Sequence, residues 1–99
     1  MPYSIPELRA IVSPLAQRYG AERVYLFGSY AQGDAHSGSD IDLRIDKGSI
    51  RGLQFAYLLG DLEDALKTPV DLISTTGMDQ RFLDSIRPDE VLLYERPRA

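Results

Sequence analysis

The stretch Gly-Ser-Tyr-Ala-Gln-Gly-Asp-Ala-His-Ser-Gly-Ser-Asp-Ile-Asp-Leu, residues 28 to 43, decides the fold of this chain. A short apolar run, Arg23 to Phe27, leads into it and predicts a buried strand that ends at Gly28. Ser29 is a favoured residue for capping a helix, so we expect a short helix through Gln32. Residues 33 to 39 are rich in Gly, Ser and Asp and predict a loop.

The end of this stretch opens the clearest strand of the sequence, Asp40 to Asp46. Apolar and charged residues alternate strictly along it, which is the pattern of a strand with one buried face. The apolar side carries Ile41, Leu43 and Ile45, and the other side carries Asp40, Asp42, Arg44 and Asp46. This segment therefore predicts a strand that presents two carboxylates, Asp40 and Asp42, on the same face.

The rest of the chain predicts strands that alternate with helices. We expect helices over Ser4–Tyr19, Leu53–Leu66 and Asp79–Ile86, and strands over Val70–Ser74 and Glu90–Glu95. Ser4 with Glu7 fits a capping box for the first helix, whereas Pro14 predicts a kink or break near Ser13. The fold class is therefore α/β or α+β, with a mixed sheet of about four strands in a single domain over residues 1–99.

Composition narrows the function. The chain has 99 residues, 15 acidic and 11 basic, for a formal net charge of -4. Affinity for phosphate backbones comes mainly from Lys and Arg, so we expect neither direct nucleic-acid binding nor a membrane surface as partner. There is no cysteine, and no apolar run approaches the length of a membrane span. We expect a cytoplasmic protein that needs metal ions or backbone dipoles to bind phosphates.

Three groups of residues can carry chemistry. Gly28 permits close approach of a ligand to the backbone, and Ser29 offers a hydroxyl; the alternative is an ordinary turn. Asp40 and Asp42 suit Mg²⁺, which takes one or two carboxylates together with substrate phosphates; the alternative is a solvated edge strand, helped by Arg44. Asp71 completes a three-carboxylate cluster if its strand lies beside Asp40–Asp42; the alternative is an exposed strand residue.

Taken together, these residues resemble the minimal nucleotidyltransferase family of the polymerase-β-like nucleotidyltransferase superfamily. The resemblance is carried by residues 28 to 43, by Pro69-Val70-Asp71-Leu72 and by Leu93-Tyr94-Glu95. It implies that Gly28 and Ser29 cradle the phosphates of ATP and that Asp40, Asp42 and Asp71 bind two Mg²⁺ ions. It also implies in-line transfer of AMP with pyrophosphate as the leaving group, and Asp71 would help to take the acceptor's proton.

The resemblance also implies a partner. Stand-alone members of this family resemble antitoxins that transfer AMP onto a tyrosine of a HEPN-domain ribonuclease toxin, so we expect a hetero-oligomer with such a toxin. Two alternatives remain open: an antitoxin that neutralises the toxin by binding alone, and a small-molecule nucleotidyltransferase subunit. Family members commonly carry Arg where this chain has Gln32, which puts the rate in doubt. We interpret His36 as exposed and structural, and we favour packing over base stacking for Tyr30.

Overall fold

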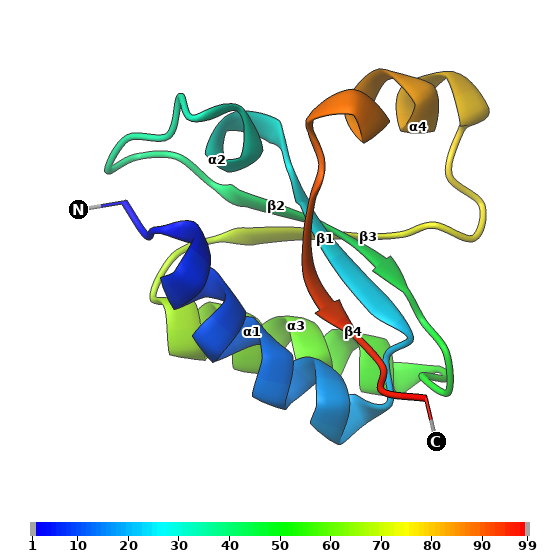
Figure 1. The fold of residues 1–99 in the computed structure, drawn as a ribbon. Helices are drawn as coiled ribbons and strands as arrows, with labels where there is room; N and C mark the ends of the chain where they lie inside the picture. Colours follow the sequence, from blue (N-terminus) through cyan, green and yellow to red (C-terminus); the bar gives the residue numbers. More distant parts are fainter. Residues whose placement is uncertain (1, 99) are drawn as a thin grey trace.

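A four-stranded mixed sheet is the frame of the molecule in the computed structural model, which describes residues 2–98 (Figure 1). Its strands are β1 (Arg23–Phe27), β2 (Ile41–Asp46), β3 (Val70–Ser74) and β4 (Val91–Glu95), in the order β3-β2-β1-β4. The helices are α1 (Ile5–Tyr19), α2 (Gly28–Gln32), α3 (Leu53–Leu66) and α4 (Gln80–Ile86), and a short 3₁₀ turn, η1 (Arg87–Asp89), follows α4. β1 is antiparallel to both β2 and β4, whereas β2 and β3 are parallel.

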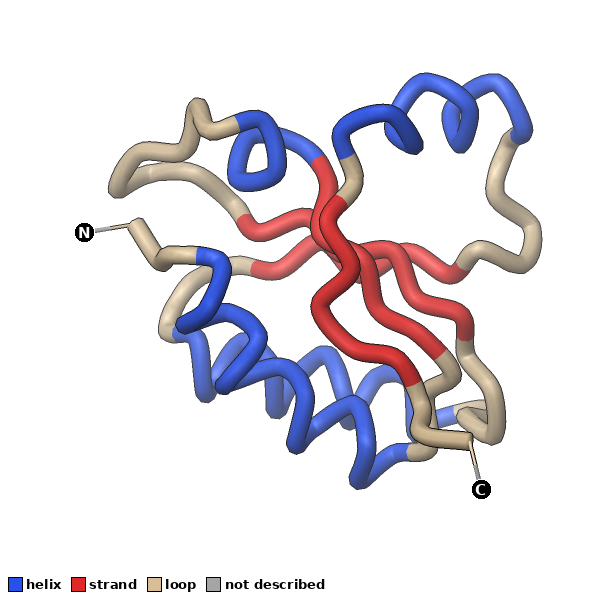
Figure 2. The backbone as a smooth tube through the Cα atoms, in the orientation of Figure 1, coloured by secondary structure: helices blue, strands red, loops and turns tan. Residues whose placement is uncertain are grey.

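The two faces of the sheet are covered differently. Figure 2 shows α1 and α3 side by side against one face, while α2 and α4 lie on the opposite side. The apolar side chains of β2, Ile41, Leu43 and Ile45, are fully buried beneath α1 and α3, as their alternation predicts. The charged side of β2 therefore faces α2 and α4, which makes that side the place to look for chemistry.

The strand β2 is not an edge strand. It lies between β3 and β1, so the alternative of a solvated edge-strand face is wrong. The charged face is also less solvated than that alternative requires, because Arg44 is only 4% exposed. Burying a charged group is costly unless it is paired, so the partners of Arg44 need an explanation, which is given with the site below.

Helix α1 confirms one expectation and corrects another. The Ser4 Oγ accepts a hydrogen bond from the Glu7 N–H at 3.2 Å, and the Ser4 N–H donates to Glu7 Oε1 at 2.8 Å, which completes the capping box. Of the kink or break expected near Ser13, the break does not occur, because α1 is continuous through Pro14. Pro14 and Ala10, four residues earlier, are both exposed, so water can satisfy the carbonyl that loses its hydrogen bond.

Two smaller expectations also need correction. The helix α2 begins at Gly28 rather than at a capping Ser29, and its N-cap residue Phe27 makes no side-chain capping bond. The strand β2 begins at Ile41, so Asp40 lies just before it. The last helix ends at Ile86, as expected, and the 3₁₀ turn η1 that follows it contains Pro88. Pro is tolerated in such a first turn, where its missing N–H has no partner to lose.

The C-terminal end of α3 carries a strained residue. Lys67 has φ 57°, the left-handed conformation that caps a helix, and its N–H donates to the Glu63 carbonyl at 2.8 Å. We expect Lys67→Gly to raise the free energy of unfolding by about 1 kcal/mol, because glycine adopts this conformation without a steric penalty. Urea denaturation measures the change, and Lys67→Ala, which keeps a Cβ, is the control that should give no gain. An equal gain from both variants would contradict the explanation.

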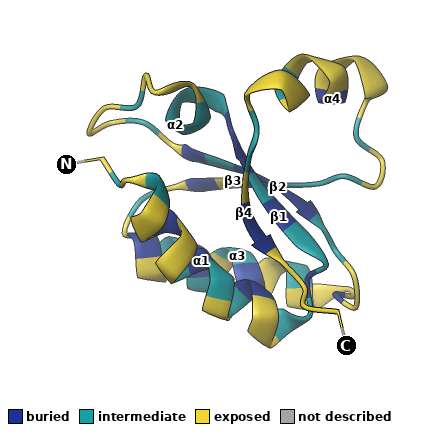
Figure 3. Ribbon diagram, viewed as in Figure 1, coloured by how far each residue is buried: buried dark blue, intermediate teal, exposed yellow. Residues whose placement is uncertain are grey.

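The exposure of residues differs between the two sides of the sheet (Figure 3). Buried residues gather where α1 and α3 meet the sheet, whereas α4 is exposed over most of its length and is anchored by Leu83. Within the part of the chain that the structure describes, no helix is long and apolar enough to cross a membrane.

Candidate functional site

At the junction between β1 and α2, the backbone of Gly28 lies against the side-chain carboxylate of Asp42. Gly28 has φ +73°, and a Cβ at this position would lie 2.2 Å from Asp42 Oδ2. No residue other than glycine fits here without moving that carboxylate, and a side chain would be strained by the backbone conformation as well. The glycine predicted to permit close approach thus has an identified neighbour, the Asp42 side chain.

The sheet brings the predicted carboxylates together. Asp71 is the direct neighbour of Asp42 in the parallel pairing of β3 with β2, and Phe27 is the neighbour of Asp42 on β1. Because neighbours in register share a face, Asp71, Asp42 and Phe27 form a row across the sheet. Asp40 lies two residues before Asp42, where the loop enters β2. The expectation that the strand of Asp71 lies beside Asp40–Asp42 is confirmed.

Asp71 is exposed, as the alternative proposed for it requires, so the cost of burying its charge does not arise. Its strand β3 is the last strand at one edge of the sheet. The two interpretations of Asp71 are therefore compatible, because Asp71 is an exposed strand residue and also lies next to Asp42.

The pKa of the Asp42 carboxyl is raised by its surroundings in the site. Partial burial raises the pKa of the Asp42 carboxyl above its usual value, and the negative charges of Asp71 and Asp40 raise it further. The direction of this shift means that the arrangement of three carboxylates is unfavourable on its own. A cation that binds there would relieve the repulsion.

The donor set suits a hard cation. The carboxylate oxygens of Asp40, Asp42 and Asp71 are the ligand type that Mg²⁺ prefers. Among residues 2–98, however, no three His, Cys, Asp or Glu side chains converge closely enough to hold a metal ion by themselves. Mg²⁺ commonly uses one or two carboxylates and completes its shell with water and substrate phosphates, so these residues fit a metal that arrives with a nucleotide.

Helix α2 carries two further residues that bear on the site, Ser29 and Gln32. Ser29 is the second residue of α2 and is partly exposed. Gln32, at the end of α2, donates from Nε2 to Asp89 Oδ2 of η1 at 3.4 Å. An Arg at this position would face the same carboxylate. The presence of Gln32 in place of the family's usual Arg therefore changes the contact between α2 and η1.

Sequence reasoning missed a buried ionic network beside the site. The Arg44 guanidinium donates to both carboxylate oxygens of Glu90, at 2.6 and 2.7 Å, and to Thr75 Oγ1 at 2.9 Å. It also stacks on the Tyr25 ring at 4.1 Å, while Thr75 donates to Asp46 at 2.6 Å. These partners satisfy the buried charge and join β2 to the segments on either side of α4 and η1. They are far apart in the sequence, so no local signal points to them.

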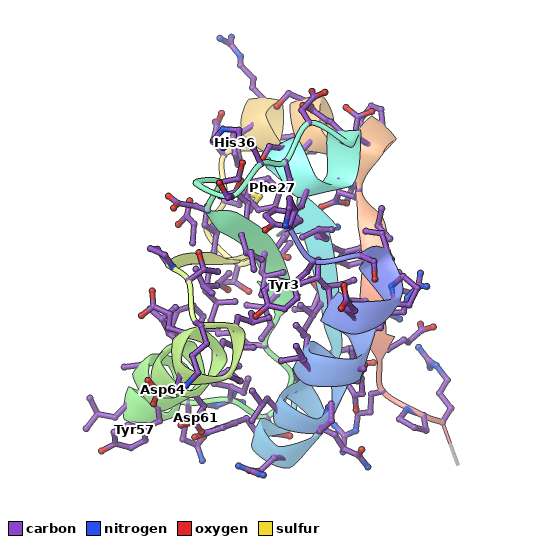
Figure 4. The ribbon with its side chains drawn as sticks, turned by 90° about the vertical axis from the view of Figure 1, so that its left-hand side faces the viewer. Tyr3, Phe27, His36, Tyr57, Asp61 and Asp64 are labelled. Carbon is purple, nitrogen blue, oxygen red and sulfur yellow. The ribbon has the colours of Figure 1, made fainter. Side chains whose placement is uncertain are left out.

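Two minor predictions are confirmed. Tyr30 packs against the hydrophobic core, as favoured over base stacking. His36 is exposed, and its Nδ1 accepts the Gly38 N–H at 3.1 Å, so the ring stabilises its own loop. Figure 4 shows His36 and Phe27 at one end of the molecule, with Tyr57, Asp61 and Asp64 of α3 at the other.

A surface hollow of about 350 Å³ lies elsewhere, lined by Gln17, Gly20, Ala21, Tyr94, Arg96 and Pro97. None of the predicted site residues lines it. Asp42 and Asp71 of the candidate site lie instead side by side on β2 and β3, with Asp40 directly before β2.

Comparison with known proteins identifies the family. Residues 10–99 match the family described as Polymerase beta, Nucleotidyltransferase. Over 72 residues the chain is 35% identical to protein adenylyltransferase MntA of Thermococcus cleftensis, which covers 72% of this chain and 73% of that protein. The chain therefore belongs to the polymerase β nucleotidyltransferase family, among its minimal nucleotidyltransferases, and it is an enzyme of the transferase class.

Solved structures agree on the fold. A structure of a minimal nucleotidyltransferase is 33% identical with a TM-score of 0.77, covering 90% of this chain and 95% of that one. The MNT antitoxin complex with the tri-AMPylated HEPN toxin of Shewanella oneidensis matches with a TM-score of 0.71 and 19% identity, covering 93% and 73%. At that identity the likeness concerns the fold. The predicted fold, a small mixed sheet with flanking helices of the polymerase-β-like nucleotidyltransferase type, is confirmed.

Proposed function

We propose that the chain transfers AMP from ATP to a tyrosine hydroxyl of a HEPN-domain toxin and thereby acts as its antitoxin. The observation that carries the proposal is the contact of Gly28 with Asp42, beside Asp71, in a member of a nucleotidyltransferase family. The name of the Thermococcus relative and the AMPylated toxin in the Shewanella complex support AMP as the transferred group and a toxin as the acceptor.

The proposed roles follow from where the residues lie. Gly28 and Ser29 bind the phosphates of ATP, because the missing side chain of Gly28 lets this backbone lie directly against the Asp42 carboxylate that would hold the metal ion. Asp40, Asp42 and Asp71 would hold Mg²⁺, two ions by analogy with the family. Bound there, Mg²⁺ supplies the positive charge that an acidic chain otherwise lacks for a triphosphate.

Asp71 serves the acceptor in this proposal. It is exposed at the edge of the sheet, where a hydroxyl group of a partner protein can approach. The Asp71 carboxylate takes the proton of that hydroxyl. The hydroxyl oxygen then bonds to the α-phosphorus of ATP while the bond to pyrophosphate breaks, so the acceptor gains AMP and pyrophosphate leaves.

A second candidate is an antitoxin that works by binding alone. One observation favours it: Gln32, which supplies no charge, is engaged with Asp89 of η1 rather than directed at a nucleotide. In this case the stable complex, and not the modification, would block the toxin. The carboxylates would then be dispensable for neutralisation.

A transfer assay tests the proposal. The pure chain is incubated with ATP, Mg²⁺ and the protein encoded beside it, and intact mass spectrometry should find one or more AMP units on the neighbour. The double variant Asp40→Asn with Asp42→Asn should transfer none, whereas Asp64→Asn, an exposed carboxylate on α3, should transfer normally. Transfer by the double variant would contradict the site, and a toxin that the double variant still blocks would favour the binding antitoxin.

A further inference from the structure

One aromatic ring beside the site is left half uncovered. Phe82 of α4 is 41% exposed, although its neighbour Leu83 is buried. Scattered apolar residues are common on protein surfaces, so exposure alone carries no argument. What distinguishes Phe82 is how firmly it is held and where it lies.

Phe82 is held from several sides. Its N–H donates to Asp79 Oδ2 at 3.3 Å, and its carbonyl accepts the Ser85 hydroxyl at 2.6 Å. Its ring meets the buried Phe27 ring edge to face, with centroids 5.8 Å apart and an angle of 84°. The backbone bonds fix Phe82 within α4, and the contact with Phe27 orients its ring, so a planar group can stack on the ring at a reduced entropic cost.

Phe27 connects this ring to the site. It precedes Gly28 directly and pairs with Asp42 across the sheet, so Phe82 rests on a residue that contacts the phosphate side of the proposed site. The row Asp71, Asp42 and Phe27 thus runs from the acceptor edge of the sheet toward Phe82. A nucleotide whose phosphates lie at Gly28 and Asp42 has its acceptor on the Asp71 side, which leaves the Phe82 side for its base.

We propose that Phe82 stacks on the adenine base of the bound nucleotide and supplies much of the affinity that the phosphates do not. The inference rests on the proposed function, because it assumes that ATP binds at Gly28, Ser29 and Asp42. It adds a base subsite, on α4, to a chain that otherwise binds its nucleotide through phosphates. Stacking uses the face of the base, so the subsite favours purines over pyrimidines through stacking strength.

Binding measured without transfer tests the subsite. The probes are α,β-methylene-ATP and tripolyphosphate, each with Mg²⁺, titrated into the full chain by calorimetry. Phe82→Leu keeps an apolar contact with Phe27 but removes the ring, and we expect it to weaken the ATP analogue roughly tenfold and leave tripolyphosphate unchanged. Phe82→Trp should restore affinity, and because the chain has no other tryptophan, its fluorescence should report the stacked base.

The control is Tyr57→Leu, which replaces an aromatic ring that is 58% exposed on α3, at the far end of the molecule (Figure 4). It should change neither affinity. Equal affinity of Phe82→Leu and the wild type for the ATP analogue would overturn the inference, and so would equal weakening of both probes, which would mark a structural effect. An unchanged nucleotide affinity with a raised KM for the partner protein would assign the ring to the acceptor instead. Failure of the wild type to bind either probe would defeat the proposed function itself.

Discussion

Gly28→Ala should lose AMP transfer by about 10²-fold while the chain stays folded. The new Cβ would lie 2.2 Å from Asp42 Oδ2, and that oxygen is the far end of a side chain that can rotate away. Rotation of the Asp42 side chain relieves the clash at little cost in the free energy of unfolding. The carboxylate then no longer occupies the position that the proposed site requires. The steric conflict is therefore resolved at the expense of activity rather than of stability.

Gly33→Ala is the matched control for this prediction. Gly33 caps the same helix with φ +80°, close to the +73° of Gly28, but a Cβ there meets nothing within 4 Å. Both variants carry a similar backbone penalty of about 1–3 kcal/mol, which thermal denaturation measures. Only Gly28→Ala should lose transfer, as measured by AMP incorporation. A comparable loss in Gly33→Ala would assign the effect to the shape of α2 instead of to Asp42.

Asp42→Asn should reduce transfer by about 10³-fold or more and yet raise the thermal stability of the metal-free chain. The first effect follows because the charge of Asp42 is required for the several kcal/mol that bound cations supply in phosphoryl transfer. The second follows from its raised pKa. A raised pKa means that the folded chain binds this proton more tightly than the unfolded chain does, so at neutral pH the ionised carboxylate lowers stability, and Asn removes that cost.

Thermal denaturation in EDTA and in Mg²⁺ measures this second prediction. In EDTA the Tm of Asp42→Asn should exceed that of the wild type. The rise in Tm caused by Asp71→Asn should be smaller in the Asp42→Asn background than in the wild type, because the two carboxylates repel each other. Mg²⁺ with a nucleotide should raise the Tm of the wild type and leave that of Asp42→Asn nearly unchanged. A wild type more stable than Asp42→Asn in EDTA would refute the electrostatic account of the site.

The local features of the fold could be predicted from the sequence. The strict alternation of residues 40–46 indicates both the strand and its buried face, and Ser4 with Glu7 indicates the start of α1. These signals are local, because a strand period or a capping box depends on residues a few positions apart. The motif of residues 28 to 43 then identified the family and the fold class.

What the sequence could not reveal depends on long-range packing. The sequence places Arg44 only in the alternative of a solvated edge strand, because its partners Thr75 and Glu90 become neighbours only after the sheet forms. The position of β2 inside the sheet is likewise a property of strand order. Pro14 misleads for a related reason, since the cost of a proline in a helix depends on whether the side that loses a hydrogen bond faces water.

The parallel pairing of β2 with β3 has a consequence for synthesis on the ribosome. Asp42 and Asp71 become neighbours only after the intervening crossover, which includes α3, has packed across the sheet. The buried Arg44 gains its partner later still, because Glu90 lies directly before β4, the last strand of the chain. A nascent chain that has emerged only through β2 therefore displays the Gly28–Asp42 motif without its third carboxylate. We therefore expect AMP transfer only from chains in which β3 has already paired with β2.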